Sequence, residues 1–490
     1  MHVVVQIRWL AVACAALTIT AARGQEILST LTLDPKEPKP LLISYSPADR
    51  GLVSLAPETG GSIRSFNVIK YDNNLRRQWK VALPQFKGQN RLEGLQVLGS
   101  TIVVLVSQYI PRANGIQVSV YRFSLAGDAY PPDTLGLLPN ESDLRDALMV
   151  ERSPDNQWLA VVAEELPNFS LGQEAAIASV VVWKLQAGKR EIEQSRWVLP
   201  VPPYDFEIKE VRVSGSGLVS LLTRQYPKDG GNAPPRFWVY RQQANPYEIK
   251  ADDGQLTDAT LRYGPANELF VAGYFSQRLA DENRVGGMVY VTLAEDTLQP
   301  PRSRQVLLPD DVRARFLSPK GVSKGREIPN LYLDRIVPRS DGGALIFSEQ
   351  FFFDDRSVQT INGPAILRNF FVYEDIVILS VSPQGQVEWS AVLDKYQAGL
   401  TREELSYTAF IGPEKIYLIY KTDTPGSGTN VYYTTLDEEG ILDIPRPIFE
   451  GFRAGDQFFT SASFQLNNAE GILVYYLAKG RRFSVSRMGL

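Results

Sequence analysis

A short strand that ends in Leu-Pro recurs along the chain, and this recurrence constrains the fold more than any other feature. The clear copies are Val81–Pro84, Gly136–Pro139, Trp197–Pro200 and Val306–Pro309, and weaker ones are Ala391–Asp394 and Pro447–Glu450. The first three prolines are 55 and 61 residues apart, and the next interval of 109 residues leaves room for a missing copy near Tyr247–Lys250. A period of about 50–60 residues indicates a propeller or another repeat array.

Each repeating unit divides into four short runs of β-forming residues. Val, Ile, Leu, Tyr and Phe fill these runs, and Gly, Pro, Asn and Asp separate them, as expected of strands joined by turns. In the first unit the expected strands are Leu41–Ser46, Gly51–Leu55, Ile63–Tyr71 and Gln78–Leu83. Helical periodicity is almost absent, and only Thr401–Leu405 and Ser142–Ala147 are candidates for single helical turns. A repeated four-stranded unit is the pattern of a propeller blade.

The two ends of the chain are expected to close the ring. The last unit offers three strands, Gln457–Leu466, Gly471–Leu477 and Arg481–Arg487, while Ile27–Asp34 resembles the fourth strands of the other units. Pairing of the N-terminal strand with the last unit removes the two unpaired sheet edges of an open ring. The prediction is therefore an all-β fold, a single propeller with eight four-stranded blades. Seven blades is the alternative, because the unit Asp310–Asp394 is overlong.

Several turns resemble those of known propeller families. Tyr71–Trp79 aligns with Val381–Trp389, and in each a strand ends in a polar turn before a Trp opens the next strand. This pattern resembles the repeats of PQQ-type and WD40-like propellers, which implies that the Trp packs between neighbouring blades. Ser153–Ala160 is similar to the blade turn of TolB-like propellers, and Ser340–Trp389 resembles uncharacterised secreted propellers of Bacteroidetes-type bacteria. The resemblance thus implies a secreted bacterial propeller.

The N-terminal segment has the pattern of a signal peptide. Arg8 precedes an apolar stretch, and the small residues before Gln25 suit cleavage at that point. We therefore expect residues 1–24 to be a signal peptide and residues 25–490 to be the propeller domain. The protein is then exported, either to the periplasm or to the outside of the cell. A membrane anchor and a lipid on Cys14 are the alternatives, and no later segment is apolar enough to span a bilayer.

His2 and Cys14 are the only histidine and cysteine, so the mature chain has neither an imidazole nor a thiol. Their absence excludes a His-dependent triad, a Cys nucleophile, a His/Cys zinc site, haem ligation by either residue and any disulfide. PQQ dehydrogenases of the propeller type carry a vicinal disulfide or a catalytic His, so the resemblance to that family does not extend to PQQ. No loop has the alternating acidic pattern of a calcium site. We expect no cofactor, no metal and no catalytic residue.

The charge distribution gives no sign of nucleic-acid or membrane binding. Residues 1–24 hold two of the 51 basic residues and no acid, so the mature chain has a net charge of −6. Neither sign of charge forms a long block. A mildly acidic chain with mixed charges is poorly suited to bind nucleic acid or an anionic membrane. We expect a monomer without nucleic-acid or membrane partners.

The candidate binding site is an insert in the sixth unit. Phe351–Asp355 begins it and Phe370–Asp375 ends it, with a polar stretch between them. Long loops on a rigid scaffold often carry function, and aromatic residues beside acids suit a sugar or a peptide. The predicted binding residues are Phe352, Asp354, Asp355, Phe371 and Tyr373. The alternative is that alternate Phe residues continue the flanking strands into the core. A second long connection, Asp310–Pro329, is either an exposed basic loop near the same face or a solvated linker.

These observations favour a binding or scaffold function without catalysis, with a protein or glycan of the cell envelope as the partner. The alternative is a glycan-active hydrolase or lyase that uses carboxylates with Tyr or Lys. The two functions predict different sites. An enzyme requires Asp, Glu, Tyr or Lys side chains that converge at one mouth of the central channel. A binding module requires an aromatic or apolar surface patch.

Overall fold

The computed structural model describes residues 27–490 apart from a set of short segments. These segments are 34–37, 59–64, 85–89, 114, 140–147, 166–177, 202–205, 227–233, 243, 279–283, 296–300, 359–365, 403–404, 425–427, 450–451, 453–455, 468 and 479. The predicted signal peptide, with His2 and Cys14, lies outside the described residues, and so does the helical turn expected at Ser142–Ala147. The export prediction therefore stays a prediction.

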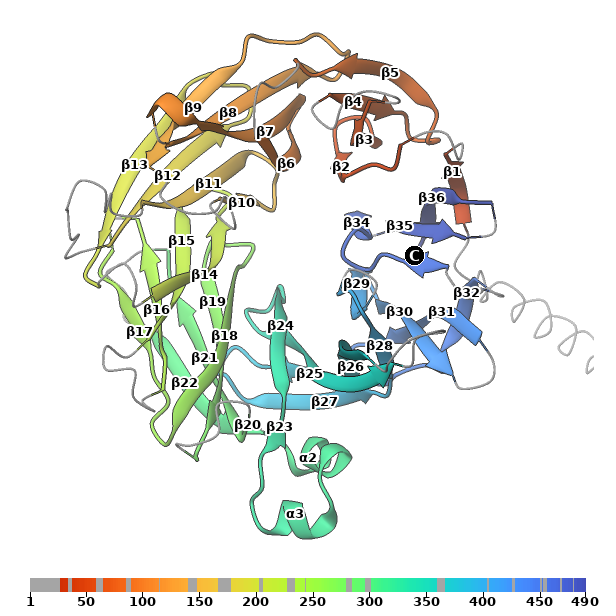
Figure 1. Ribbon diagram of the computed structural model, residues 1–490. Helices are drawn as coiled ribbons and strands as arrows, with labels where there is room; N and C mark the ends of the chain where they lie inside the picture. The colour runs from red at the N-terminus through yellow and green to blue at the C-terminus, as the bar shows by residue number, and fades with distance from the viewer. Residues whose placement is uncertain are drawn as a thin grey trace, which may run out of the picture.

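Eight antiparallel sheets stand around a central channel as the blades of a propeller (Figure 1). Blades 1 to 4 follow one another along the chain. Blade 1 contains β2 (Leu42–Ser46), β3 (Gly51–Pro57), β4 (Phe66–Tyr71) and β5 (Arg77–Ala82). Blade 2 contains β6 (Asn90–Leu98), β7 (Thr101–Ile110), β8 (Gly115–Ser124) and β9 (Asp133–Pro139), with the 3-10 turn η1 (Pro111–Ala113) between β7 and β8. Blade 3 contains β10 (Met149–Arg152), β11 (Trp158–Glu165), β12 (Ala178–Gln186) and β13 (Ile192–Leu199). Blade 4 contains β14 (Phe206–Val213), β15 (Val219–Gln225), β16 (Arg236–Arg241) and β17 (Tyr247–Ile249).

Blades 5 to 8 have the same order of strands, from the channel outward, with two short additions. Blade 5 contains β18 (Gln255–Tyr263), β19 (Leu269–Ser276), β21 (Gly287–Leu293) and β22 (Arg302–Leu307). Blade 6 contains β24 (Leu331–Pro338), β25 (Ala344–Val358), β26 (Ile366–Val381) and β27 (Val387–Leu393), and β28 (Gln397–Gly399) also pairs with β26. Blade 7 contains β29 (Tyr407–Ile411), β30 (Ile416–Thr424), β31 (Gly428–Leu436) and β32 (Arg446–Phe449). Blade 8 contains β33 (Gln457–Phe458), β34 (Phe464–Asn467), β35 (Glu470–Leu477), β36 (Arg482–Gly489) and β1 (Ile27–Thr32).

The recurring Leu-Pro strands are the outermost strands of the blades. β5, β9, β13 and β22 carry the clear copies, β27 and β32 carry the weaker ones, and β17 is the copy whose motif is missing. The leucines of the clear copies are buried, with exposed fractions of 4% for Leu83, 4% for Leu138, 1% for Leu199 and 3% for Leu308. The Pro that follows stops the strand because it has no N–H to continue the ladder. The eight-blade prediction is therefore confirmed, and the seven-blade alternative is wrong.

The N-terminal strand closes the ring, as predicted. β1 pairs antiparallel with β36, and the register places Thr30 opposite Ser486 and Thr32 opposite Ser484. The hydroxyl oxygens of Thr30 and Ser486 are 2.8 Å apart, within hydrogen-bond distance. The first strand of the described chain is thus the fourth strand of the last blade, and the outer edge of β36 is covered.

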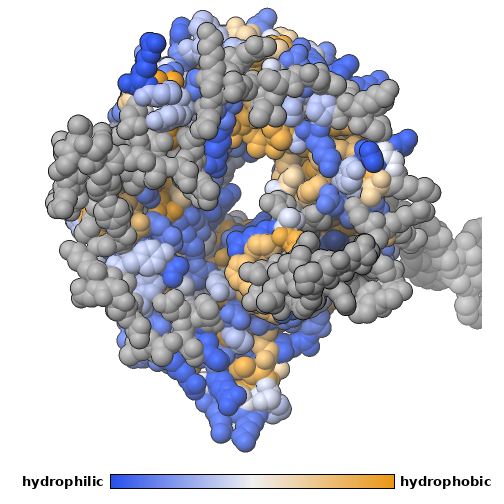
Figure 2. Space-filling model, viewed as in Figure 1, coloured by the Kyte–Doolittle hydropathy of each residue, from blue (hydrophilic) through white to orange (hydrophobic). Residues whose placement is uncertain are grey.

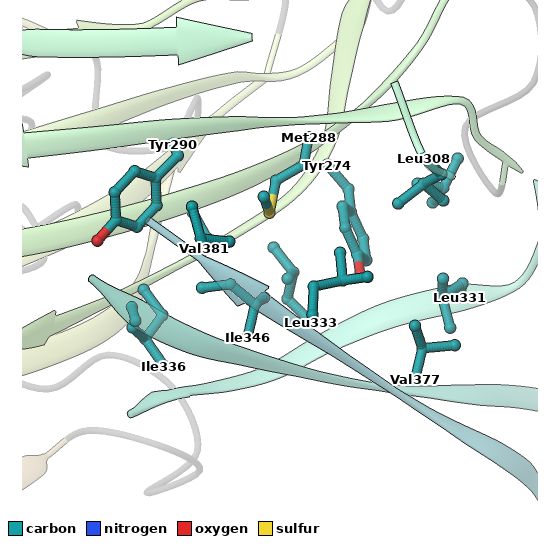
Figure 3. Packing of buried hydrophobic residues seen from close by; sticks show 14 of the residues in the cluster. Tyr274, Met288, Tyr290, Leu308, Leu331, Leu333, Ile336, Ile346, Val377 and Val381 are labelled. Atoms are coloured by element: carbon teal, nitrogen blue, oxygen red, sulfur yellow. The ribbon is translucent and has the colours of Figure 1, made fainter. Parts of the chain in front are cut away.

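The hydrophobic core lies between neighbouring blades. Figure 3 shows the cluster between blades 5 and 6, where Tyr274 and Met288 pack against Leu333, Ile346 and Val377. The Tyr274 hydroxyl lies 2.5 Å from the hydroxyl of Ser348 in blade 6, so the buried phenol has a polar partner. Each sheet is covered on both faces in this way, which gives the inner strands of the ring a fixed position.

The connection Asp310–Pro329, expected as an exposed basic loop or a linker, contains two short helices. They are α2 (Asp310–Phe316) and α3 (Pro319–Ser323), which lie outside the ring below blades 5 and 6 in Figure 1. β23 (Ile328–Pro329) then pairs with β20 (Arg284–Val285). Two of the basic residues form ion pairs, Arg313 with Asp310 and Arg315 with Asp394.

The helical turn expected at Thr401–Leu405 lies partly outside the described residues, which leave out residues 403–404. Its described residues form a bend with one turn-type hydrogen bond, from the Leu405 N–H to the Arg402 carbonyl. Within the described residues, no helix has the length and apolar character needed to cross a membrane.

Candidate functional site

The predicted insert of blade 6 is a β-hairpin that extends the blade. β25 and β26 remain paired well past the length of the other strands, with Phe351 opposite Tyr373 and Phe353 opposite Phe371. β28 adds a third strand, because Gly399 pairs with Phe371 and Gln397 with Tyr373. The alternative noted from the sequence is thus correct in part. The Phe residues do continue the flanking strands, but Phe353 is 56% exposed and does not enter the core.

Four aromatic side chains gather on one face of this hairpin, and they are called the aromatic cluster below. Ring centroids are 4.8 Å apart for Phe351 and Tyr373, 5.2 Å for Phe353 and Phe371, and 5.1 Å for Phe351 and Phe353. Residues directly opposite each other on paired strands share a face of the sheet. A β-bulge between Glu349 and Phe351 shifts the register of the two strands and so determines which residues lie opposite each other.

Arg402 lies over the aromatic cluster. The central guanidinium carbon is 4.9 Å from the ring centroids of Phe351 and Phe371 and 5.8 Å from that of Phe353. A guanidinium over aromatic faces is held by the ring quadrupole and by stacking. Arg402 follows β28 in the chain and was not predicted from the sequence, because it carries no motif and lies about 20 residues beyond the end of the hairpin at Val381.

The structure brings together only two of the five predicted binding residues. Phe371 and Tyr373 belong to the aromatic cluster. Phe352 and Asp354 alternate with the cluster residues along β25 and therefore lie on the other face of the hairpin. The backbone of Asp355 pairs with Asn369, but its side chain lies outside the described residues.

The aromatic cluster borders a cavity of about 730 Å³ in the central channel, since Tyr373 and Arg402 both line it. The space-filling view in Figure 2 shows this channel as an open hole through the ring, with hydrophilic residues gathered on the side of β10, β14 and β18. The inner strands β14, β18, β24, β29 and β34 supply most of the wall. The charged residues of the wall are Arg212, Arg262, Arg335, Arg402 and Asp334.

The charges of the wall are connected by ion pairs. Arg212 lies 3.0 Å from Glu210 and 3.6 Å from Glu151. Glu151 also lies 3.6 Å from Arg262, so one carboxylate serves two guanidinium groups. Burial raises the pKa of Glu151, and Arg212 and Arg262 offset only part of that rise. Burial lowers the pKa of Arg262, and the positive charge of Arg212 lowers it further.

A second group of titratable residues lies behind the wall at the junction of blades 6 and 7. Lys395 Nζ is 2.5 Å from Glu349 Oε1, and the side chains of Lys395 and Glu349 are 0% and 7% exposed. The Ser406 hydroxyl, which borders the cavity, donates to the other oxygen of Glu349. Burial raises the pKa of Glu349 and lowers that of Lys395, although the attraction between the two opposes both changes.

Asp334 and Tyr407 form the acid–phenol pair of the same junction. The Tyr407 hydroxyl donates to Asp334 Oδ2 at 2.6 Å, and Arg335 Nε donates to the same oxygen at 2.7 Å. Burial and the charge of Asp334 raise the pKa of Tyr407 well above its ordinary value, so the phenol stays protonated. Among the described residues, no group of three or more acids is arranged to hold a metal ion.

No protein-family model matches the sequence, and no curated protein matches it. Solved structures, propeller domains among them, are similar in their general arrangement. The WD40 domain of SCAP from fission yeast is 10% identical over 94% of this chain and 98% of its own, with a TM-score of 0.39. The β-propeller domain of the Trilobed protease from Pyrococcus furiosus is 10% identical over 82% of this chain and 94% of its own, with a TM-score of 0.34. The GH93 α-L-arabinofuranosidase of Fusarium graminearum, solved with arabinobiose, is 12% identical over 72% of this chain and 95% of its own, with a TM-score of 0.31. At such low similarity the fold assignment rests on the strand pairing described above.

Proposed function

We propose that this propeller is a non-catalytic binding module that holds a glycan or protein of the cell envelope at the mouth of its channel. The observation that carries the proposal is the aromatic cluster, which lies under Arg402 and borders the channel cavity. Aromatic residues and Arg are enriched in binding interfaces, and one ring of the cluster, Phe353, is 56% exposed. Paired strands hold the rings, so little order has to be gained when a partner binds.

The proposal includes export of the protein from the cytoplasm. A signal peptide over residues 1–24 would place the propeller in the periplasm or outside the cell, where envelope glycans and proteins are accessible. The absence of His and Cys from the mature sequence agrees with a function that needs neither metal nor thiol chemistry. A monomer presenting one channel mouth is sufficient for this function.

The alternative, a glycan-active hydrolase or lyase, is favoured by one arrangement. Two carboxylates, Glu349 and Asp334, lie near the cavity with Lys395, Ser406 and Tyr407 as neighbours. Two facts make this alternative weaker. Lys395 has no exposed side-chain surface, so it does not reach a ligand. Tyr407 keeps its proton at neutral pH and already donates it to Asp334, so it is a poor base.

A glycan array tests the proposal with two matched variants. The double variant Phe353→Ala/Phe371→Ala removes the exposed ring of Phe353 and the half-buried ring of Phe371 opposite it, neither of which belongs to the core between the blades. Ile444→Ala is the control, because Ile444 is 83% exposed and does not border the cavity. We expect the double variant to retain array ligands about tenfold less well than wild type or worse, since two aromatic contacts of about 0.5–1.5 kcal/mol each are lost. The control should bind as wild type does.

Two results would contradict the proposal. One is equal retention by wild type and the double variant, which would move the site away from the cluster. The other is loss of the native circular dichroism spectrum in the double variant, which would make the cluster part of the core. A second variant tests whether the rings or the rest of the hairpin bind the partner. In it, Asn-Gly replaces Asp354–Phe370, which shortens the hairpin but keeps all four rings of the aromatic cluster. It should bind like wild type if the rings carry the binding.

A further inference from the structure

Three arginines face the channel cavity from three consecutive blades. Arg212 is on β14, Arg262 is on β18 and Arg335 is on β24, each on the innermost strand of its blade. With Arg402 they make four cations in the cavity wall, against Asp334 as the single acid of that wall. The mature chain as a whole is acidic, so this concentration of positive charge is local to the channel.

The three guanidinium groups differ in how many of their N–H donors already have an acceptor in the protein. Arg212 donates to the carbonyls of Leu261 and Val211 at 3.1 and 3.0 Å and pairs with Glu210 at 3.0 Å. Arg335 uses its Nε for Asp334. None of the described residues accepts a hydrogen bond from Arg262 or from the two terminal nitrogens of Arg335. A guanidinium has five N–H donors, so most of the donors of these two residues are available to a ligand.

Arg262 and Arg335 are accessible although protein surrounds them. Their side chains are 43% and 38% exposed, and both border the channel cavity. The positive charges of Arg212 and Arg335 act on Arg262, and together with burial they lower its pKa. The nearest acid to Arg262 is Glu151 at 3.6 Å, which Arg212 shares. A bound anion between the guanidinium groups of Arg262 and Arg335 would reduce the electrostatic repulsion between these two positive charges.

We propose that Arg262 and Arg335 bind the carboxylate of an acidic glycan whose sugar ring lies against the aromatic cluster. This inference rests on the proposed function and names its ligand class. Guanidinium groups suit carboxylates because their paired N–H donors match the two carboxylate oxygens. A uronic acid carries an apolar ring face and a carboxylate on the same sugar unit. The ring face would stack on the aromatic cluster, and the carboxylate would pair with the arginines that border the same cavity. An acidic peptide carries its carboxylates on flexible side chains without such a ring face.

Isothermal titration of the mature chain tests the assignment with three probes. The probes are an oligomer of galacturonic acid, the neutral galactose oligomer of the same length, and hexaglutamate. The variants are Arg262→Gln and Arg335→Gln, with Arg236→Gln as the control, since Arg236 is a 71% exposed arginine outside the cavity wall. We expect the galacturonate oligomer to bind wild type. Each cavity variant should weaken that binding by about tenfold or more, the loss of a charge-assisted contact. The control should leave it unchanged, and added salt should weaken the wild type more than either variant.

Other outcomes overturn the inference in distinguishable ways. The neutral and the acidic oligomer could bind equally well, with no effect of Arg262→Gln or Arg335→Gln. If that binding is lost in Phe353→Ala/Phe371→Ala, the anion site is refuted and the proposed function stands. Tighter binding of hexaglutamate would refute the glycan class. Failure of all three probes to bind the wild type would refute the inference as a whole. Because two separate arginines are tested, misfolding of one variant leaves the other to decide.

Discussion

The ring of Trp389, on the outer strand of blade 6, lies against Gly440 in a turn of blade 7. A Cβ on Gly440 would be 2.6 Å from two atoms of that ring. The Trp389 Nε1–H also donates to the Glu438 carbonyl of the same turn at 2.9 Å. Trp79 repeats the arrangement between blades 1 and 2, where it covers Gly127. The expectation that an aligned Trp packs between neighbouring blades is therefore confirmed at both positions.

The first prediction concerns this contact between blades. Gly440→Ala should destabilise the protein by roughly 2–3 kcal/mol, because its φ of 84° suits Gly and because the new methyl group would displace Trp389. Gly188→Ala is the matched control, since Gly188 has a φ of 73° but no atom near its Cβ position. It should cost only about 1 kcal/mol. Urea unfolding measures both, and equal losses would show that the Trp389 contact adds nothing.

The second prediction concerns ring closure. Deletion of Ile27–Leu33 should lower the melting temperature and cause aggregation, because it uncovers the edge of β36 and removes the buried Leu33. A synthetic peptide with the sequence of residues 27–33 should restore the melting temperature by adding back the missing strand. A scrambled peptide of the same composition is the control. A truncated protein that stays monomeric and melts like wild type would be inconsistent with closure by β1.

The third prediction concerns the buried ion pair of Glu349 and Lys395. Glu349→Gln and Lys395→Met should each cost about 3–5 kcal/mol, because each leaves one buried charge without its partner. The double variant should cost less than either single one, since no unpaired charge remains. A double-mutant cycle in urea gives the coupling. Simple additivity of the two losses would mean that the pair is not coupled.

The fourth prediction concerns stability at high pH. Burial raises the pKa of Tyr263 to about 12, although the hydrogen bond with Ser220 opposes the rise. The folded state thus favours the neutral phenol, so its contribution is complete below pH 10, where the unfolded chain begins to ionise, and is lost as the pH rises through 12. Tyr263→Phe should reduce the loss of stability over this range by roughly 2–3 kcal/mol. Melting curves from pH 9 to 12 check this, and parallel curves for the two proteins would argue against it.

The architecture was predictable because its signals are local. A buried Leu followed by Pro marks each clear outer strand, such as Leu199 and Pro200 at the end of β13, within a few residues of sequence. The closure by β1 followed from a missing fourth strand. The helices α2 and α3 gave no comparable signal, because seven and five residues are too few for a helical period to appear.

The candidate site was predictable only in part, because its geometry depends on contacts between distant residues. The hairpin was located correctly, but the bulge after Glu349 decides that Phe351 and Phe353, rather than Phe352, share a face with Phe371. Arg262 and Arg335 border the same channel cavity from different blades. Nothing in the sequence around either arginine indicates such a neighbour, since it is the packing of β18 against β24 in adjacent blades that places both on one cavity.

The most direct test of the central claim is to recover the bound ligand and examine it. An oligosaccharide retained by the wild-type protein is incubated with it for a day at neutral pH, released and analysed by mass spectrometry. A binding module returns the oligosaccharide with its length and mass unchanged. Shorter fragments formed by wild type, and not by an Asp334→Asn variant that melts like wild type, would contradict the account and establish the hydrolase or lyase alternative.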